Sequence, residues 1–209
     1  MRILSWDVGQ KNLAVCLFDD DNIIDWRVID LTTNIKSKLK TKDLTELSQI
    51  LLEILSKEPK WLETDIILIE NQPTKNPIMK TIQMIIFTYY QFKKFQKEFL
   101  GDVKLFNPRI KLSKQTDCPS LEELNYKRTN KDDYSHRKKL SIAMTKYYLT
   151  KNESNWIEVW KSSKKKDDLS DCYLQARAYW LNKQKPKSNI KSTDIKINIT
   201  DHNEIIKPE

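Results

Sequence analysis

The sequence predicts an α/β fold in which a mixed five-stranded sheet, three antiparallel strands followed by two parallel ones, is flanked by helices. Three observations predict it. Three short apolar runs near the N-terminus are joined by brief polar turns, which is typical of an antiparallel meander. Two further apolar runs each follow a segment with helical periodicity, as in helix–strand units. Two more helical segments then complete the order βββ-α-β-α-β-α-α.

The strands are identified by apolar runs that end in polar turns. They are predicted at residues 2–6, 13–18, 23–31, 65–69 and 103–106. The run Asp19-Asp20-Asp21-Asn22 predicts a tight turn between the second and third strands. The fourth strand, with sequence DIILI, is nearly all apolar, as in a strand buried on both faces of its sheet.

The helices are identified by apolar residues spaced three or four apart. They are predicted at residues 43–57, 77–99, 135–149 and 168–182. Asp43 is expected to cap the first helix, with Glu46 as its capping-box partner. Pro77 suits the first turn of the second helix, and Gly101 suits its end.

The second helix carries more apolar residues than one core-facing stripe needs. Its main stripe is predicted to consist of Ile78, Ile82, Ile85, Ile86, Tyr89, Phe92, Phe95 and Phe99. Met79, Phe87 and Tyr90 lie off that stripe, and a helix that is apolar on two faces often makes a second contact. We therefore expect this helix to be the interface of a homodimer.

The chain is predicted to form one domain over residues 1–182, followed by a polar C-terminal tail over residues 183–209. A length of 209 residues supports one domain with a substantial core. Residues 113–134 are mostly polar and are predicted to be a loop or insertion that either binds a partner or is neutral.

The charge balance favours a polyanionic partner. There are 37 Lys and Arg against 29 Asp and Glu, which gives a net charge of +8 and a pI of about 9.2. Lys and Arg displace counterions from phosphate backbones, so nucleic acid is expected, although a merely soluble surface would also be basic.

Cysteine and histidine are too few for the common sites built from them. Cys16, Cys118 and Cys172 are widely spaced, which argues against a disulfide framework and a CxxC zinc site and fits a reducing, intracellular setting. His136 and His202 are the two histidines. No apolar run is long enough to span a membrane, and no secretory or mitochondrial leader is recognisable.

Four carboxylates stand where the predicted elements could bring them together. Asp7 follows the first strand, Glu70 ends the fourth, and Asp168 and Asp171 share one face at the start of the last helix. Structural roles are open for some of them: Asp7 in a turn, Asp168 as a helix cap and Asp171 against the helix dipole. A cluster of all four would suit Mg²⁺, which prefers oxygen ligands. Two such ions promote phosphodiester hydrolysis.

Six segments resemble, in order, those of the RuvC-like Holliday-junction resolvases, and most of all the poxvirus-type and related large-DNA-virus resolvases. The segments are SWDVGQKNLAVC, IIDWRVIDL, LIENQP, LFNPRIKL, HRKKLSIAM and KKDDLSDCYLQA. The resemblance runs from Met1 to about Trp180 and rests on the series D-x-G, I-E-x-Q and KKDD-x-x-D. It implies a ribonuclease-H-like fold and a Mg²⁺-dependent crossover-junction endonuclease that acts in DNA recombination or repair.

The resemblance also implies roles for individual residues. Asp7, Glu70, Asp168 and Asp171 match the metal-binding carboxylates, with two Mg²⁺ per site and Mn²⁺ as a substitute. Lys111 matches a lysine near the scissile phosphate, and either Lys138 or Lys139 matches a second; we assign Lys139 to catalysis. The residues expected to bind DNA are Lys11, Lys111, Lys114, Arg137, Lys138, Lys165 and Lys166.

The implied protein is a homodimer, because two-fold symmetry presents two active sites to a nearly two-fold four-way junction. A viral protein of this kind would work in the host-cell cytoplasm or a viral factory rather than in mitochondria. Two alternatives stay open: a broader nuclease of the same fold that cuts flaps, branches or RNA–DNA hybrids, and an inactive nucleic-acid-binding module.

Overall fold

The computed structural model describes residues 1–32, 44–120, 122–124, 134–152 and 154–184. Its single five-stranded sheet has the order β3-β2-β1-β4-β5. The strands are β1 (Arg2–Asp7), β2 (Leu13–Asp19), β3 (Asn22–Ile29), β4 (Ile66–Glu70) and β5 (Asp102–Phe106). The first three pair antiparallel, whereas β1–β4 and β4–β5 pair parallel. The predicted mixed sheet is confirmed, and each strand lies within two residues of its expected bounds.

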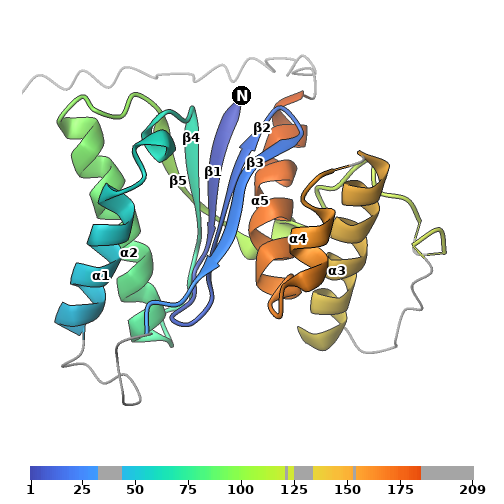
Figure 1. The fold of residues 1–209 in the computed structure, drawn as a ribbon, viewed down its shortest axis with the longest axis horizontal. Helices are drawn as coiled ribbons and strands as arrows, with labels where there is room; N and C mark the ends of the chain where they lie inside the picture. Colours follow the sequence, from blue (N-terminus) through green and yellow to red (C-terminus); the bar gives the residue numbers. More distant parts are fainter. Residues whose placement is uncertain (33–43, 121, 125–133, 153, 185–209) are drawn as a thin grey trace, which may run out of the picture.

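Helices cover both faces of the sheet (Figure 1). One face carries α1 (Leu44–Ser56) and α2 (Pro77–Phe95), and the other carries α3 (Tyr134–Lys151), α4 (Ile157–Ser162) and α5 (Lys166–Gln184). Two short 3₁₀ helices, η2 (Pro59–Leu62) and η3 (Pro108–Ile110), precede β4 and follow β5. The sheet therefore separates two apolar cores, one on each side.

The end of the second predicted helix is wrong by four residues, and so is part of its apolar stripe. The helix ends at Phe95, and Lys97 reverses the chain with a left-handed φ of 62°. Phe92 and Phe95 are 54% and 82% exposed, whereas Tyr90 is fully buried. Gly101 does not end the helix; a Cβ there would lie 2.4 Å from the carbonyl oxygen of Thr64, so glycine lets the chain pass close to the start of β4.

Other boundaries differ more modestly. Helix α4 was not predicted as a helix, and α5 begins at Lys166, so Asp168 lies inside its first turn and is not its cap. Helix α5 continues to Gln184, two residues beyond its predicted end. The expected cap Asp43, most of the C-terminal tail and residues 125–133 lie outside the described residues. No helix in the described part of the chain is long and apolar enough to cross a membrane.

Candidate active site

Strand alternation places Asp7 and Glu70 on the same face of the sheet. Successive side chains of a strand point to opposite faces. In β1, Ile3 packs in the core on the α5 side, so Asp7, four residues later, belongs to that side. In β4, Ile66 and Leu68 pack there too, and Glu70 continues the series. Because β1 and β4 are parallel neighbours, the two carboxylates meet at the carboxyl ends of their strands.

Helix α5 brings the other two carboxylates to this edge. Its buried Gln175 contacts the neighbouring strands β1 and β4. The side-chain nitrogen donates to the Ser5 Oγ at 3.1 Å, the Trp6 carbonyl oxygen at 3.2 Å and the Leu68 carbonyl oxygen at 3.4 Å. Asp171 and Asp168 lie one and two turns before Gln175 on the same helical face. The contact of Gln175 with β1 therefore aligns both carboxylates with the strand ends.

A hollow of about 440 Å³ opens between these elements, and we call it the acid hollow. The four predicted carboxylates line it: Asp7, Glu70, Asp168 and Asp171. The β1–β2 loop forms its wall, where a Cβ on Gly9 would lie 2.4 Å from the carbonyl oxygen of Asn12. Gly9 of the D-x-G motif thus permits the tight loop beside Asp7.

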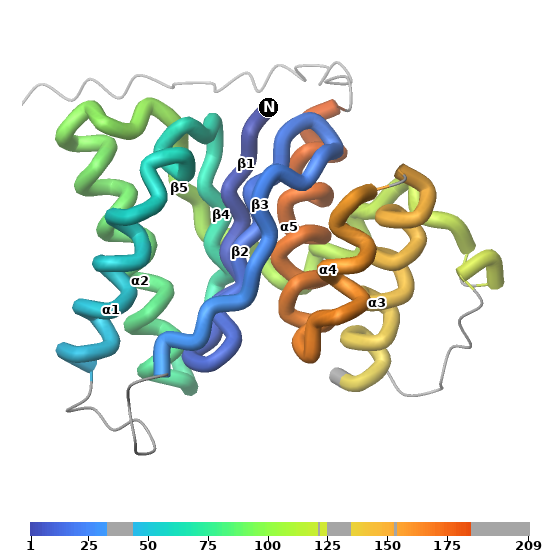
Figure 2. Tube along the Cα trace, viewed as in Figure 1, coloured from blue at the N-terminus to red at the C-terminus, as the bar shows by residue number. Residues whose placement is uncertain are grey.

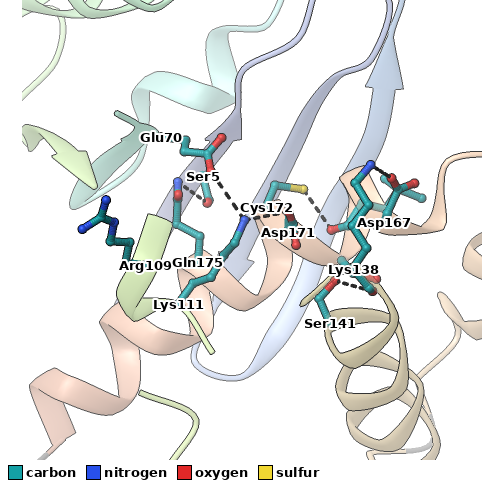
Figure 3. A network of polar contacts seen from close by, with 12 residues as sticks. Ser5, Glu70, Arg109, Lys111, Lys138, Ser141, Asp167, Asp171, Cys172 and Gln175 are labelled. Carbon is teal, nitrogen blue, oxygen red and sulfur yellow. Dashed lines mark hydrogen bonds and ion pairs between the residues drawn. The ribbon is translucent and has the colours of Figure 1, made fainter. Parts of the chain in front are cut away.

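Lys111 lies among these carboxylates. Its Nζ is 2.7 Å from the Asp171 Oδ2 and 3.5 Å from the Glu70 Oε1 (Figure 3). Burial alone would lower the pKa of Lys111, but the charges of Asp171, Glu70 and Asp7 raise it above its usual value. Lys111 is therefore a fixed positive charge that offsets part of the cluster's negative charge.

The acid hollow disfavours full ionisation of its carboxyls. Burial, with Glu70 as the next cause, raises the pKa of Asp7 well above its usual range. Burial would also raise the pKa of Glu70, but the hydrogen bond from Asp7 and the charge of Lys111 lower it. Burial raises the pKa of Asp171, although Lys111 opposes the rise. Of the two neighbours, Asp7 is therefore the carboxyl whose pKa burial raises, and Glu70 the one whose pKa its surroundings lower.

Asp168 is the member of the cluster with a buried carboxylate oxygen that lacks a hydrogen-bond partner. Burial and the neighbouring Asp167 raise its pKa to about 6. Its Oδ2 atom is buried and has no hydrogen-bond partner. Asp167, by contrast, is ion-paired with Lys138, and that lysine lowers the pKa of Asp167 despite burial (Figure 3).

A second hollow of about 760 Å³ adjoins the first and is lined by basic residues, so we call it the basic hollow. Its charged lining consists of Arg109, Lys111, Arg137 and Lys138, together with the shared carboxylates Glu70 and Asp171. The site thus joins a carboxylate cluster to a cationic groove.

Two solved structures share this architecture. The crystal structure of the yeast mitochondrial Holliday junction resolvase matches with a TM-score of 0.60 and 19% identity, over 86% of this chain and 79% of that one. The fowlpox virus resolvase, solved with its Holliday junction substrate, matches with a TM-score of 0.55 and 19% identity, over 88% of this chain and 100% of that one. The chain has the fold of the Holliday-junction resolvases. The expected ribonuclease-H-like architecture is thereby confirmed.

A sequence relative is viral. An uncharacterized protein of Acanthamoeba polyphaga mimivirus is 37% identical over 133 residues, which is 61% of this chain. The match spans about a third (32%) of that protein. No protein-family model matches the chain. Because one fold can host several activities, the function of this resolvase-fold chain is argued from its site.

The resolvase fold gathers some of the predicted basic residues and not others. Lys111, Arg137, Lys138 and Lys165 line one or both hollows. Lys139, expected in catalysis, is exposed and lines neither hollow, whereas its neighbour Lys138 lines both. Three other residues predicted to bind DNA line neither hollow: Lys11, Lys114 and Lys166.

Sequence reasoning missed three residues at this site. Arg109 lines the basic hollow, Asp167 holds Lys138, and Gln115 bonds the backbone of Lys111. Arg109 could have been suspected from its place in the motif NPRIK. The partners of Asp167 and Gln115 depend on contacts between segments far apart in sequence, which no local pattern indicates.

The donor set of the resolvase-fold site suits Mg²⁺, since all four predicted ligands supply carboxylate oxygens. The buried, unpartnered Oδ2 of Asp168 is the atom that most needs a cation. Within the described residues, no three His, Cys, Asp or Glu side chains converge closely enough to hold one ion together. The Lys111 ammonium stands between two of the carboxylates and provides the compensating charge.

Proposed function

We propose that this chain is a Mg²⁺-dependent endonuclease that resolves four-way DNA junctions. The observation that carries the proposal is the acid hollow: four carboxylates from β1, β4 and α5, gathered at one edge of a resolvase fold beside a basic hollow. The fowlpox virus resolvase that shares this fold was solved with a Holliday junction. The net charge of +8 suits the same polyanionic substrate.

The four carboxylates would hold the metal. Bound Mg²⁺ supplies a water activated for attack and stabilises the leaving oxygen, which are the two needs of phosphodiester hydrolysis. Asp7 and Glu70 offer oxygens from the sheet, and Asp168 and Asp171 offer them from α5. Their mutual repulsion makes the metal-free site costly and favours binding of a divalent cation. Mn²⁺, with similar ligand preferences, would substitute.

The lysines would act on the phosphate. Lys111 carries a buried positive charge next to Asp171, where it can offset the negative charge that develops on the phosphoryl oxygens. Lys138 stands at the border of the two hollows, held by Asp167. Arg109 and Arg137 are exposed in the basic hollow and would neutralise backbone phosphates on either side of the cut.

The exposed side of α2 supports a homodimer. An open, apolar groove of about 730 Å³ runs between α1 and α2, with Leu52, Met84 and Phe92 between 41% and 54% exposed. Apolar residues so exposed next to one another commonly mark an interface. A second copy of the chain across a two-fold axis would cover this groove and provide the second active site that paired nicks require.

Cleavage of a labelled synthetic four-way junction tests the proposed activity. Wild type and Asp168→Asn are compared in Mg²⁺ and in EDTA, beside a linear duplex and a flap. The proposal predicts paired, symmetric nicks in the junction alone, dependent on Mg²⁺ and lost in the variant. Equal cutting of the flap would indicate a broader branched-DNA nuclease, and tight binding without any cutting would indicate an inactive binding module.

Sedimentation at micromolar concentration tests the dimer. The wild type should be dimeric and Met84→Glu monomeric, because a buried carboxylate at the centre of an apolar interface is costly. Val159→Glu is the matched control, since Val159 is 46% exposed but lies on α4, on the other side of the sheet. A monomeric wild type would contradict the dimer.

A further inference from the structure

The segment that follows Lys111 is tied to α5 through a buried arginine. Arg177 of α5 is 3% exposed, and its Nη1 and Nη2 donate to the two carboxylate oxygens of Asp117 at 2.7 and 2.6 Å. Its Nε donates to Asp21 in the β2–β3 turn at 3.1 Å, and its guanidinium lies 3.7 Å from the centre of the Tyr148 ring. Figure 2 shows the segment beyond β5 passing α5 on its way to α3. Arg177 thus joins four parts of the chain.

Gln115 connects this arginine to Lys111. Its side-chain oxygen accepts from the Arg177 Nη1 at 3.2 Å, and its side-chain nitrogen donates to the carbonyl oxygens of Leu174 at 2.8 Å and Lys111 at 2.9 Å. Gln115 is 5% exposed, so its polar atoms depend on these partners. A continuous series of hydrogen bonds therefore runs from Arg177, through Gln115, to the backbone of Lys111.

The backbone of Lys111 needs such an anchor. Lys111 follows η3, a 3₁₀ helix of three residues, and no strand or long helix of the described chain holds it. Its long side chain has four rotatable bonds, so a small shift of the backbone would displace the ammonium from Asp171 and Glu70. The bond from Gln115 to the Lys111 carbonyl fixes where the side chain begins.

The neutral amide suits this task better than a carboxylate. An ionised glutamate at position 115 would have no hydrogen to donate to the Lys111 and Leu174 carbonyls. It would also add a negative charge beside the backbone of Lys111, which would compete with Asp171 and Glu70 for the Lys111 ammonium. The Gln115 amide can hold the backbone of Lys111 and leave the positive charge of the Lys111 side chain directed at Asp171.

We propose that Gln115 is a positioning residue for Lys111, and that Arg177 and Asp117 hold Gln115 in place. The catalytic part of this inference rests on the proposed nuclease function. Gln115 lines neither hollow; it acts by keeping the Lys111 ammonium beside Asp171 and Glu70. Its loss should slow the chemical step while junction binding stays the same.

A double-mutant cycle tests the catalytic part. Gln115→Met, which keeps the length of the side chain, should lower the single-turnover rate of junction cleavage in saturating Mg²⁺ by roughly tenfold, as expected for a misplaced catalytic group. Junction affinity, measured in Ca²⁺, should not change. In a Lys111→Ala background, Gln115→Met should have no further effect. Equal rate losses in both backgrounds, or a loss of affinity that accounts for the rate, would overturn the proposal.

Labelling of lysine amines tests the positioning without any cleavage. Acetic anhydride at trace concentration should modify Lys111 slowly in the wild type and several-fold faster in Gln115→Met, while the exposed Lys104 reacts equally in both. Unchanged labelling of Lys111 would overturn the positioning role. Absence of cleavage in the wild type would instead contradict the proposed function and leave the labelling result valid.

Two further variants separate positioning from a general loss of structure. Thr145 lies on α3, and its buried hydroxyl has no hydrogen-bond partner. Thr145→Val should therefore change neither the cleavage rate nor the labelling of Lys111. Gln115→Glu keeps the acceptor for Arg177 and removes the donor to Lys111. It should therefore have the effects expected of Gln115→Met, and it replaces Gln115→Met in these tests if Gln115→Met folds poorly. Normal labelling and cleavage in a folded Gln115→Glu would contradict the proposal.

Discussion

The two faces of the sheet are held by different kinds of contact. On the α5 face, polar side chains bridge helix and sheet: Gln175 donates to β1, and the Trp26 Nε1 of β3 donates to the Leu169 carbonyl oxygen at 3.0 Å. On the other face, α1 and α2 pack mainly through apolar side chains such as Leu51 and Ile86, both fully buried.

The difference corresponds to what each face must do. Apolar packing is largely non-directional and tolerates small shifts of a helix, whereas a hydrogen bond weakens steeply when its geometry changes. The α5 face must align Asp168 and Asp171 with Asp7 and Glu70. The α1–α2 face has only to stabilise the sheet and, by our proposal, to offer a dimer surface. We therefore expect substitutions on the two faces to separate activity from stability.

Asp168→Asn should separate activity from stability most clearly. The change replaces one oxygen of the proposed metal site, in a carboxylate whose Oδ2 is buried without a hydrogen-bond partner, so junction cleavage should fall by roughly 10³-fold, or about 4 kcal/mol of transition-state stabilisation. Without divalent metal, the variant should be at least as stable as the wild type, because the cluster loses repulsion. Cleavage assays and thermal unfolding in EDTA measure the two effects. A variant that is both inactive and clearly destabilised would show that Asp168 is structural.

The reverse separation is expected for Ile86→Ala on α2. Removing a fully buried side chain should lower the free energy of unfolding by about 2–5 kcal/mol. Urea denaturation measures the loss. At a temperature where the variant is folded, its cleavage rate should match that of the wild type, since Ile86 lies across the sheet from the acid hollow. A proportionate loss of cleavage in the folded variant would mean that the two faces are coupled.

A smaller effect distinguishes two neighbouring lysines on α3. Lys138→Ala should lower cleavage by roughly tenfold to a hundredfold, because by our proposal it removes a charge-assisted hydrogen bond to the phosphate at the border of the hollows. Lys139→Ala is the matched control and should stay near the wild-type rate, since Lys139 is exposed and lines neither hollow. Single-turnover rates for both variants measure the effect. The opposite ranking would favour Lys139, the lysine that the sequence analysis assigns to catalysis.

The sequence was sufficient for the sheet and for the four carboxylates because both follow local rules. Alternation along β1 and β4 gives Asp7 and Glu70 a common face, and an i, i+3 spacing gives Asp168 and Asp171 another. The resemblance implied that these two pairs of carboxylates, which come from distant segments, meet in one site. The structure then brings all four carboxylates to one hollow.

Local patterns failed where a distant contact decides. The apolar stripe on α2 was extended through Phe92 and Phe95, yet Lys97 turns the chain back and Tyr90 is the residue that is buried. The polar composition of residues 113–134 predicts a loop that binds DNA or is neutral, and it gives no sign that Gln115 and Asp117 bond to Arg177 of α5. Polar residues that hydrogen-bond to each other from distant segments leave no periodic pattern in the sequence.

The smallest effect that we predict concerns Asp117 and acid stability. Its hydrogen bonds from Arg177, the largest cause, lower the pKa of Asp117 below its usual value. A lowered pKa in the folded state adds stability that is present above the ordinary aspartate pKa of about 4 and is lost as the pH falls through the lower value. Wild type should therefore exceed Asp117→Asn in urea stability near neutral pH, and the difference should shrink below about pH 4. We expect a difference in unfolding free energy of less than about 1 kcal/mol, because the Asp117 side chain is 37% exposed and solvent screens the pair.

Asp102→Asn is the comparison: that carboxylate pairs with Lys94 but is 60% exposed, so its removal should cost less at every pH. A difference for Asp117 that does not vary with pH would mean that its charge contributes nothing and that Arg177 is held by its other partners.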